Sequence, residues 1–329
     1  MPFFSCLFGR SDSSREQSFE VDDELSGIHN AKLYTYKELR IATEDFSPAN
    51  KIGEGGFGSV YKGRLKDGKI AAIKVLSAES RQGVREFLTE IQVISEIQHE
   101  NLVKLYGCCV EGNHRILVYN FLENNSLAQT LLGVGNSQSN IQFNWQTRAK
   151  ICIGVARGLV FLHEDVRPHI IHRDIKASNI LLDKDLTPKI SDFGLAKLIP
   201  PNMTHVSTRV AGTIGYLAPE YAIRGQLTRK ADIYSFGVLV VEIVSGRCNT
   251  NMRLPIEEQY LLEQISLLCT KTHPSSAPQP LSSVVKMLTP GLITIFMDPQ
   301  SKSPQTLRWN QRIHLLTIAR TTQILQLVI

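Results

Sequence analysis

The chain has 329 residues, 43% of them hydrophobic, which is enough for a substantial core in one or two domains. Its net charge of +5 comes from 36 basic and 31 acidic residues scattered along the sequence, so we expect no nucleic-acid partner. No apolar run reaches the ~18 residues that a membrane-spanning helix needs. The six cysteines lack zinc-binding spacing, which favours free thiols in a reducing, cytoplasmic compartment.

Residues 1–33 are expected to form a disordered leader. Residues 11–24 are polar and charged, a composition that rarely folds by itself. Residues 1–9 instead carry three phenylalanines around Cys6. A palmitoyl chain on Cys6 would allow weak, peripheral association with the inner face of the plasma membrane. A frayed hydrophobic terminus is the equally open alternative.

A glycine-rich run, GEGGFG at 53–58, is followed by the strand-like segment VYKG and by a second strand at 70–76. Asp67 and Gly68 are typical of the tight turn between two such strands. The pattern G-x-G-x-x-G also occurs in dinucleotide-binding turns, but those lead from a strand into a helix. Because this run continues as a strand, we expect a hairpin whose backbone N–H groups cover phosphate oxygens.

Three helices are predicted from the spacing of apolar residues. The first covers 81–98, with Phe87, Ile91, Ile94 and Ile97 on one face. The other two, at 145–163 and 231–245, are apolar enough to belong to a core. Asp232, near the start of the third helix, is expected to cap its first amides.

The runs HRDIKASN and SDFGLAK carry the chemistry. They bring together a carboxylate (Asp174), an ammonium (Lys176), an amide (Asn179) and a second carboxylate (Asp192). Phosphoryl transfer from ATP uses these groups: a base orients the attacking hydroxyl, a cation neutralises phosphate, and oxygen ligands hold Mg²⁺. Asp-Phe-Gly alone occurs by chance in many turns, whereas both runs in this order are a specific signal.

With these motifs, residues 46–246 resemble the serine/threonine catalytic domain of plant receptor-like kinases, and 34–246 resemble the cold-responsive group of receptor-like cytoplasmic kinases. The matching runs include ATEDFSPANKIGEGGFGSVYKG, EFLTEIQVISEIQHENLVKLYG, HIIHRDIKASNILLD and TRVAGTIGYLAPEYA. The resemblance implies an α+β, bilobal protein-kinase fold with a small β-rich N-lobe (34–122) and a larger helical C-lobe (123–299). It also implies transfer of the ATP γ-phosphate to Ser/Thr hydroxyls of protein substrates, with Mg²⁺, downstream of a receptor kinase in plant signalling.

The resemblance assigns roles to single residues. Asp174, Lys176 and Lys74 would be catalytic, with Glu90 favoured over Glu86 as the ion-pair partner of Lys74. Asn179 and Asp192 would hold the metal. Asp232 matches the family residue that braces the catalytic loop. Nucleotide contacts are implied for Ile52, Gly53, Glu54, Gly55, Gly56, Phe57, Gly58, Val60, Ala72, Lys74, Tyr119, Asn120 and Leu122.

Regulation by phosphorylation is expected from Arg173, which directly precedes Asp174. A buried guanidinium at this place seeks an anion, and a phosphorylated activation loop provides one. The candidate phosphosites are Thr204, Ser207, Thr208 and Thr213. By family position Thr208 is favoured, while Thr213 is expected to bond Asp174 and Lys176.

After Gly246 the resemblance fails, and the C-lobe is expected to be incomplete from about residue 263. The family buries an arginine against the glutamate found here as Glu220, and residues 273–280, shortly before the helix-like stretch 282–288, contain no arginine. Loss of one member of a buried ion pair costs roughly 3–5 kcal/mol. Residues 300–329 form a divergent, partly apolar tail. An incomplete lobe leaves two alternatives open: a nucleotide-binding module with little or no activity, or a product that does not fold stably.

Overall fold

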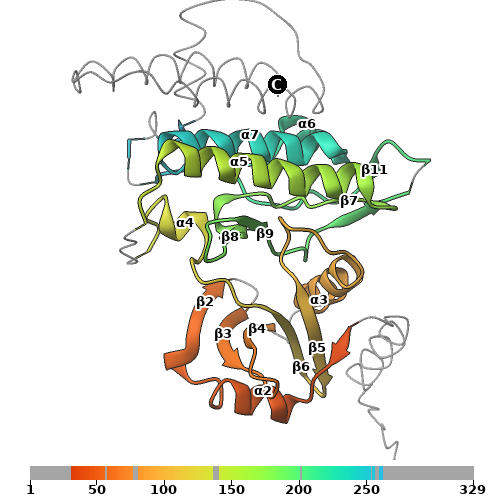
Figure 1. The fold of residues 1–329 in the computed structure, drawn as a ribbon. Coiled ribbons are helices and arrows are strands. Elements are labelled where there is room, and N and C mark those ends of the chain that lie inside the picture. Colours follow the sequence, from red (N-terminus) through yellow and green to blue (C-terminus); the bar gives the residue numbers. More distant parts are fainter. Residues whose placement is uncertain are drawn as a thin grey trace, which may run out of the picture. The chain divides into compact units, whose positions relative to one another are not determined.

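The computed structural model describes residues 31–55, 58–76, 81–135, 141–200, 202–252, 254–255 and 259–261. Residues 1–30, with Cys6, lie outside the described residues, as do the predicted break near residue 263, the stretch 282–288 and the tail 300–329. The chain divides into two compact units. We call them the N-lobe (up to Glu96, with Leu105–Tyr119) and the C-lobe (Ile97–Lys104 and from Asn120 onward). The predicted α+β fold with a β-rich N-lobe and a helical C-lobe is confirmed (Figure 1).

The N-lobe contains a six-stranded sheet in the order β1-β5-β6-β4-β3-β2. Its elements are β1 (Lys32–Leu33), α2 (Tyr36–Ala42), a 3-10 turn (Pro48–Asn50), β2 (Lys51–Gly55), β3 (Gly58–Arg64), β4 (Ile70–Leu76), α3 (Arg81–Ile94), β5 (Leu105–Glu111) and β6 (His114–Asn120). Two residues of the predicted leader, Lys32 and Leu33, form β1 and pair in parallel with β5.

The predicted hairpin is present. β2 pairs with β3, and β3 pairs with β4, both antiparallel. At the turn between β3 and β4, Asp67 accepts a hydrogen bond from the N–H of Lys69 (3.1 Å), and Gly68 adopts φ 83°. A side chain at Gly68 would be strained in that left-handed conformation, which explains the Asp-Gly pair.

Helix α2 covers one face of the sheet and was not predicted (Figure 1). Leu39 of α2 is fully buried; it packs in one cluster with Ile73 and Ile116 of the sheet and with Leu65, which follows β3. The start of α2 is fixed by a capping box: Thr35 Oγ1 accepts from the N–H of Glu38 (3.2 Å), and Glu38 Oε2 accepts from the N–H of Thr35 (2.9 Å). The sequence signal for this helix is the T-x-x-E spacing.

Helix α3 confirms the predicted apolar face but is shorter than predicted. Phe87, Ile91 and Ile94 are buried at 0%, 0% and 2% exposure. The N–H of Ser95 closes the last turn on the carbonyl of Ile91. Ile97, the fourth residue of the predicted stripe, lies beyond the helix in the segment that belongs to the C-lobe.

The C-lobe contains two long helices, α5 (Trp145–Val160) and α7 (Arg229–Ser245), which lie side by side (Figure 1). Its other elements are α4 (Leu127–Thr130), a π turn (Phe161–Asp165), β7 (His169–Ile171), a 3-10 turn (Ala177–Asn179), β8 (Ile180–Leu182), β9 (Pro188–Ile190), β10 (Lys197–Ile199), β11 (Val206–Ser207), α6 (Pro219–Arg224) and β12 (Gln226–Leu227). Of the helices in the described ranges, none combines the length and apolar character needed to cross a membrane.

Both long helices differ from the prediction at one end. The helix predicted to end at 163 changes at Phe161 into one π turn, which contains the buried His163. Helix α7 begins two residues earlier than predicted, because Thr228 is its N-cap and accepts a hydrogen bond from the N–H of Lys230 (3.2 Å). The predicted capping role of Asp232 is therefore wrong. Its carboxylate has other partners, described below.

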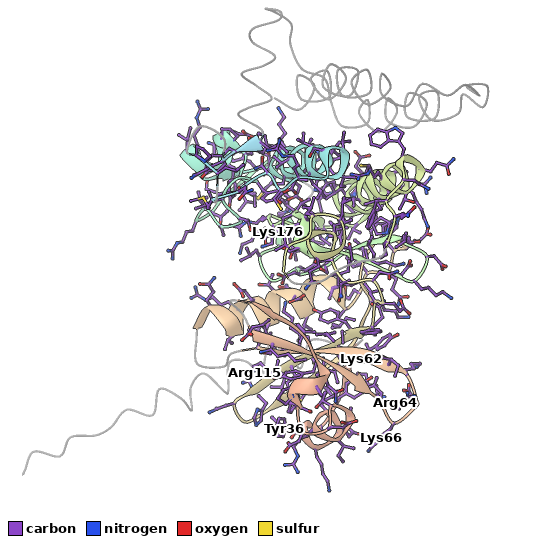
Figure 2. All side chains as sticks on the ribbon, turned by 90° about the vertical axis from the view of Figure 1, so that its left-hand side faces the viewer. Tyr36, Lys62, Arg64, Lys66, Arg115 and Lys176 are labelled. Atoms are coloured by element: carbon purple, nitrogen blue, oxygen red, sulfur yellow. The ribbon has the colours of Figure 1, made fainter. Side chains whose placement is uncertain are left out.

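The capping box of α2 should respond to acid. Lys66 donates to Glu38 Oε1 (2.8 Å), and this bond, with the N–H and hydroxyl of Thr35, lowers the pKa of Glu38 to about 2. Figure 2 labels Lys66 and the α2 residue Tyr36 in this part of the N-lobe. Because the folded pKa is depressed, the stabilisation is present above the ordinary pKa of 4.5 and is lost as the pH falls towards 2.

We therefore expect Glu38→Gln to lower the thermal unfolding midpoint at pH 7, and the difference from the unmodified chain to shrink steadily below pH 4.5. Melting curves from pH 7 to pH 3 measure this. The matched control is Glu44→Gln, because Glu44 is exposed and has no ion pair among the described residues. An equal loss for both variants at every pH would contradict the assignment.

Candidate active site

The carboxylate of Asp174 is the centre of a polar cluster in the C-lobe. It is 5% exposed and lies between β7 and the 3-10 turn that follows. Asp174 Oδ2 accepts from Lys176 Nζ (2.7 Å) and from Asn179 Nδ2 (3.0 Å). Its Oδ1 accepts from the hydroxyl of Thr213 (2.6 Å), which also accepts from Lys176 Nζ (2.9 Å). Three of the residues predicted from HRDIKASN thus meet, together with Thr213 from the later segment.

The backbone of this loop is held by Asp232, which is fully buried in the first turn of α7. The carboxylate accepts from the N–H of His172 (2.7 Å), the N–H of Arg173 (2.8 Å) and His163 Nε2 (2.9 Å). Burial opposes the charge, but the bond from His163 and the backbone N–H groups keep the pKa of Asp232 below its ordinary value. Of the two roles given to Asp232, the helix cap is wrong, while the bracing of the loop that the resemblance implies agrees with these hydrogen bonds.

The anchor compensates for backbone strain. Arg173 has φ 72°, a left-handed conformation that a non-glycine residue adopts at a cost of about 1–3 kcal/mol. Its N–H is one of the two that point at Asp232. Asp174 is the next residue, so the conformation of Arg173 sets the direction in which the carboxylate of Asp174 projects.

Asn179 and Asp192 are brought together by the β8–β9 hairpin, which pairs Ile180 with Ile190. Ser191 donates to the carbonyl of Asn179 through both its N–H (2.9 Å) and its hydroxyl (2.9 Å). Asp192, the next residue, has φ 69°. Asn179 directly precedes β8 and Asp192 follows β9 by two residues, so the two residues predicted to bind metal flank the open end of one hairpin.

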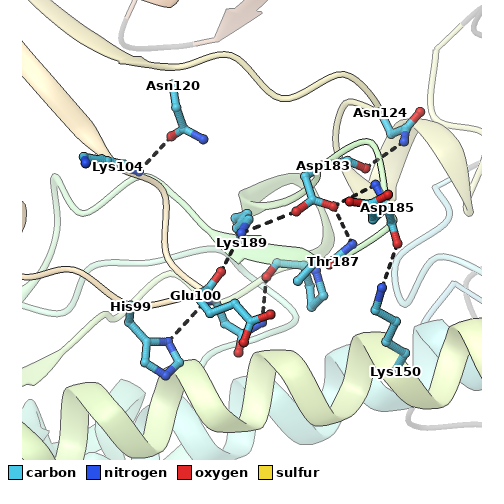
Figure 3. Close-up of polar contacts among 12 residues, drawn as sticks. His99, Glu100, Lys104, Asn120, Asn124, Lys150, Asp183, Asp185, Thr187 and Lys189 are labelled. Carbon is cyan, nitrogen blue, oxygen red and sulfur yellow. Dashed lines mark hydrogen bonds and ion pairs between the residues drawn. The ribbon is translucent and has the colours of Figure 1, made fainter.

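The far end of this hairpin is fixed by Asp183 (Figure 3). Asp183 Oδ1 accepts from the N–H groups of Asp185 (3.0 Å) and Thr187 (2.8 Å), and Lys189 lies 3.4 Å from its Oδ2. Burial opposes the charged form, but these donors lower the pKa of Asp183. Lys189 also donates to the carbonyl of Glu100 (2.7 Å), which ties the hairpin to the segment before β5.

The two sequence motifs also touch through rings. Phe193 is fully buried, and its ring lies edge-on to His172 with centroids 4.8 Å apart. His172 Nε2 is 3.1 Å from the carbonyl oxygen of Ser191. The HRD and DFG runs are thus parts of one packed unit in the C-lobe.

In the N-lobe, Lys74 of β4 forms an ion pair with Glu90 of α3 (3.0 Å). Glu90 is 1% exposed, whereas the alternative, Glu86, accepts instead from Gln82 Nε2 (3.0 Å). Glu90, not Glu86, is therefore the residue of α3 that pairs with Lys74. Val60 is the cross-strand partner of Lys74, so Val60, Ala72 and Lys74 lie on the same face of the sheet.

The glycine-rich hairpin has the expected strands, while Gly56 and Phe57 at its tip lie outside the described residues. Gly53 and Glu54 pair with Val60 and Ser59. Ile52 lies at an irregularity in the register of β2. Gly58 has φ 140°, and a Cβ there would lie 1.9 Å from the carbonyl oxygen of Val75, so only glycine fits.

The segment predicted to contact adenine begins at the end of β6. Tyr119 and Leu122 are both 8% exposed. The N–H of Asn120 donates to the carbonyl of Lys104 (3.0 Å), and its side-chain Oδ1 accepts from the N–H of Lys104 (2.8 Å; Figure 3). The N–H of Asn120 is therefore taken by Lys104, and its side-chain oxygen has a structural role that the sequence did not reveal.

The activation segment, the stretch between Asp192 and Glu220, pairs with the region after α6. β11 pairs with β12, and the N–H of Thr208 donates to the carbonyl of Gly225 (3.1 Å). Thr204 and Ser207 are exposed and Thr208 is half-buried. Thr213 differs from these three, because its hydroxyl is engaged by Asp174 and Lys176.

A second buried acid supports the segment after Thr213. Glu242 of α7 is 2% exposed and accepts from the hydroxyl of Tyr216 (2.6 Å) and the N–H of Asn249 (2.7 Å). Burial raises the pKa of Glu242. Sequence reasoning missed this residue, although an acid inside the apolar run VVEIV was a visible signal.

The protein kinase domain family matches residues 46–302. The chain belongs to the protein kinase family. It is 64% identical to Cold-responsive protein kinase 1 of Arabidopsis thaliana over 341 residues, covering 90% of this chain and 87% of that protein. It is 51% identical over 307 residues to a probable LRR receptor-like serine/threonine-protein kinase of the same plant, covering 84% of this chain but only 29% of the relative.

In this kinase the hydroxyl of Thr213 is the contact that links the activation segment to Asp174. We expect Thr213→Val to lower kcat/KM roughly 10- to 100-fold, because a hydrogen bond to two charged groups is lost. Thr213→Ser keeps the hydroxyl and should stay within about threefold of the unmodified enzyme. Steady-state transfer of labelled phosphate to a serine-containing peptide measures both. Equal rates for the valine variant and the unmodified enzyme would refute the role.

Proposed function

We propose that this kinase transfers the γ-phosphate of ATP to serine and threonine hydroxyls of proteins. The arrangement around Asp174 is the observation that supports this most. A buried carboxylate, 2.7 Å from an ammonium and 2.6 Å from a hydroxyl that reaches it from the activation segment, can accept or orient a substrate hydroxyl. Lys176 would neutralise negative charge on the transferred phosphoryl group.

The nucleotide and metal assignments remain those made from the sequence. Asn179 Nδ2 donates to both the carbonyl (2.9 Å) and the carboxylate (3.0 Å) of Asp174, which orients the amide and leaves its Oδ1 as an acceptor. Among the described residues there is no group of three or more His, Cys, Asp and Glu side chains that could hold a metal. We therefore propose that Asn179 and Asp192 hold Mg²⁺ jointly with phosphate oxygens. The ion, when bound, neutralises phosphate charge.

For ATP, we propose that Lys74, positioned by Glu90, binds phosphate and that Val60 and Ala72 contact the base. The carbonyl of Asn120 and the N–H of Leu122 are proposed to hydrogen-bond adenine beside Tyr119. The hairpin residues Ile52, Gly53, Glu54, Gly55, Gly56, Phe57 and Gly58 are proposed to cover the nucleotide.

The regulation and the location of the protein are also proposed from the family resemblance. Thr208, with Ser207 and Thr204 as alternatives, is proposed as the site of activation-loop phosphorylation, and an upstream receptor kinase as its source. The described cysteines Cys108, Cys109, Cys152 and Cys248 are free thiols, which supports a reducing, cytoplasmic location. Palmitoylation of Cys6, with weak attachment to the inner membrane surface, stays a proposal.

The incomplete C-lobe after about residue 263 also stays a proposal. The alignment with the cold-responsive relative spans 341 residues, more than the 329 of this chain, so the relative has residues that this chain lacks. Glu220 is exposed and has no ion pair among the described residues, which fits the missing arginine.

Nucleotide binding should be visible as thermal stabilisation. With Mg·ATP at about a hundred times its dissociation constant, we expect the melting midpoint to rise by roughly 5–10 °C. Asp174→Asn should melt near the unmodified chain, because it conserves shape. No shift with Mg·ATP would count against a folded nucleotide site.

Catalysis is tested by transfer of labelled phosphate to the chain itself and to a generic serine- and threonine-containing protein. Asp174→Asn should reduce transfer roughly 10²- to 10⁴-fold, the usual contribution of a general base. Phosphoamino-acid analysis should show phosphoserine and phosphothreonine. Transfer no greater than that of Asp174→Asn would exclude the proposed activity for this chain.

A further inference from the structure

The guanidinium of Arg173 is a buried cation next to Asp174, and it donates four hydrogen bonds. Arg173 is 7% exposed. Its Nη1 donates to the carbonyl of Leu195 (3.1 Å), and its Nη2 donates to the carbonyl of Arg209 (2.7 Å). Its Nε and Nη2 both donate to the hydroxyl of Tyr221, at 3.1 and 2.5 Å. Four of the hydrogen bonds that a guanidinium can donate thus end on uncharged oxygens.

The hydroxyl of Tyr221 is shared between the catalytic loop and the activation segment. Besides its bonds from Arg173, it accepts from the N–H of Ala211 (3.0 Å) and lies 3.3 Å from the carbonyl oxygen of Arg209, to which it can donate. One oxygen therefore connects the residue before Asp174 to two residues of the activation segment. A bridge of this kind is what a phosphorylated loop residue supplies when it binds an arginine.

The position of this hydroxyl is rigid. Tyr221 is 1% exposed in α6 and packs in a buried cluster with Ile171 of β7, Leu227 of β12 and Ala231 of α7. The Arg173 Cζ lies 5.7 Å from the centroid of the Tyr221 ring. Because the ring is buried among these side chains, little conformational entropy is lost when the hydroxyl binds the guanidinium.

The residues that precede Arg209 in the activation segment are hydrogen-bonded to the end of α6 and to β12. The N–H of Thr208 donates to the carbonyl of Gly225, the residue that ends α6. β11 and β12 add a short ladder through Val206 and Leu227. Residues 206–211 are therefore attached to α6 and the strand after it through uncharged groups.

We propose that the phenol hydroxyl of Tyr221 is a permanent, uncharged ligand of Arg173 that does the work of a loop phosphate. Tyr221 is then a positioning residue: it acts through Arg173 and holds Asp174 and the activation segment in register before any phosphorylation. The inference rests on the proposed kinase activity. It predicts that the enzyme transfers phosphate while Thr204, Ser207 and Thr208 are unmodified.

The test compares four full-length proteins. Two have the natural loop and two carry Thr204→Ala, Ser207→Ala and Thr208→Ala together; within each pair one also carries Tyr221→Phe. All are treated with phosphatase, and kcat and KM are measured separately with a serine peptide. The loop-alanine protein should stay within about threefold of the phosphatase-treated natural loop, and adding Tyr221→Phe should lower its kcat/KM roughly tenfold or more.

Rescue separates positioning from general destabilisation. Preincubation with Mg·ATP should restore much of the activity of Tyr221→Phe when the loop is natural, because a loop phosphate can replace the missing ligand, and should restore none when the loop is alanine. Tyr106→Phe is the matched control, since it removes a half-buried hydroxyl from the N-lobe strand β5. It should leave activity unchanged in both loops.

Two results would overturn the proposal: a loop-alanine protein more than about tenfold less active than the natural loop, or full activity of Tyr221→Phe in the loop-alanine protein. The first of these results would overturn the proposal even if Tyr221→Phe folds poorly, because it does not involve that variant. If the unmodified chain transfers no more phosphate than Asp174→Asn, the proposed function fails instead. Amide exchange then decides the contact alone: the N–H of Ala211 should exchange slowly in the unmodified chain and faster in Tyr221→Phe, and equal exchange would overturn the assignment.

Discussion

The site depends on one buried carboxylate, that of Asp232. It has no exposed surface and accepts from the backbone of His172 and Arg173 at 2.7 and 2.8 Å. A charge in such a place is tolerated only when hydrogen bonds satisfy it, and here those bonds come from the loop that must be held. The strained φ of Arg173 persists because the folded C-lobe provides this acceptor. The direction of Asp174 follows from it.

From this anchor the C-lobe cluster extends in two directions. Through His172 it reaches Phe193 and Ser191, and Ser191 in turn fixes the carbonyl of Asn179. Through the side chain of Arg173 it reaches Tyr221 and the activation segment. One hydrogen-bonded network therefore includes the catalytic loop, the predicted metal-binding hairpin and the activation segment. A substitution in one of them is expected to alter the hydrogen bonds of the others.

The sequence indicated which residues carry the chemistry better than it indicated which residues hold them in place. Asp174, Lys176 and Asn179 were predicted because phosphoryl transfer restricts residue types at fixed spacing, and the structure places them in one hydrogen-bonded cluster. It also pairs Glu90 with Lys74, while the roles of these residues stay proposals. The residues that hold the site in place were harder to predict. Tyr221 lies 48 residues from Arg173, and Glu242 lies 26 residues from Tyr216, so no local sequence pattern links the members of each pair. For Asp232 two roles were predicted, a helix cap and, by resemblance, a brace of the catalytic loop; Thr228 caps the helix, and the carboxylate of Asp232 binds the loop. The helix α2 was a missed local signal, since its T-x-x-E capping box is readable from the sequence.

The most direct test of this account is amide hydrogen exchange at His172 and Arg173 in the unmodified chain and in Asp232→Asn. Asparagine keeps the size of the side chain but removes the charge that both N–H groups share. The account predicts exchange at these two amides roughly 10- to 100-fold faster in the variant, with the N-lobe strands β3 and β4 unchanged. Unaltered protection of His172 and Arg173 in Asp232→Asn would show that something other than this carboxylate holds the catalytic loop.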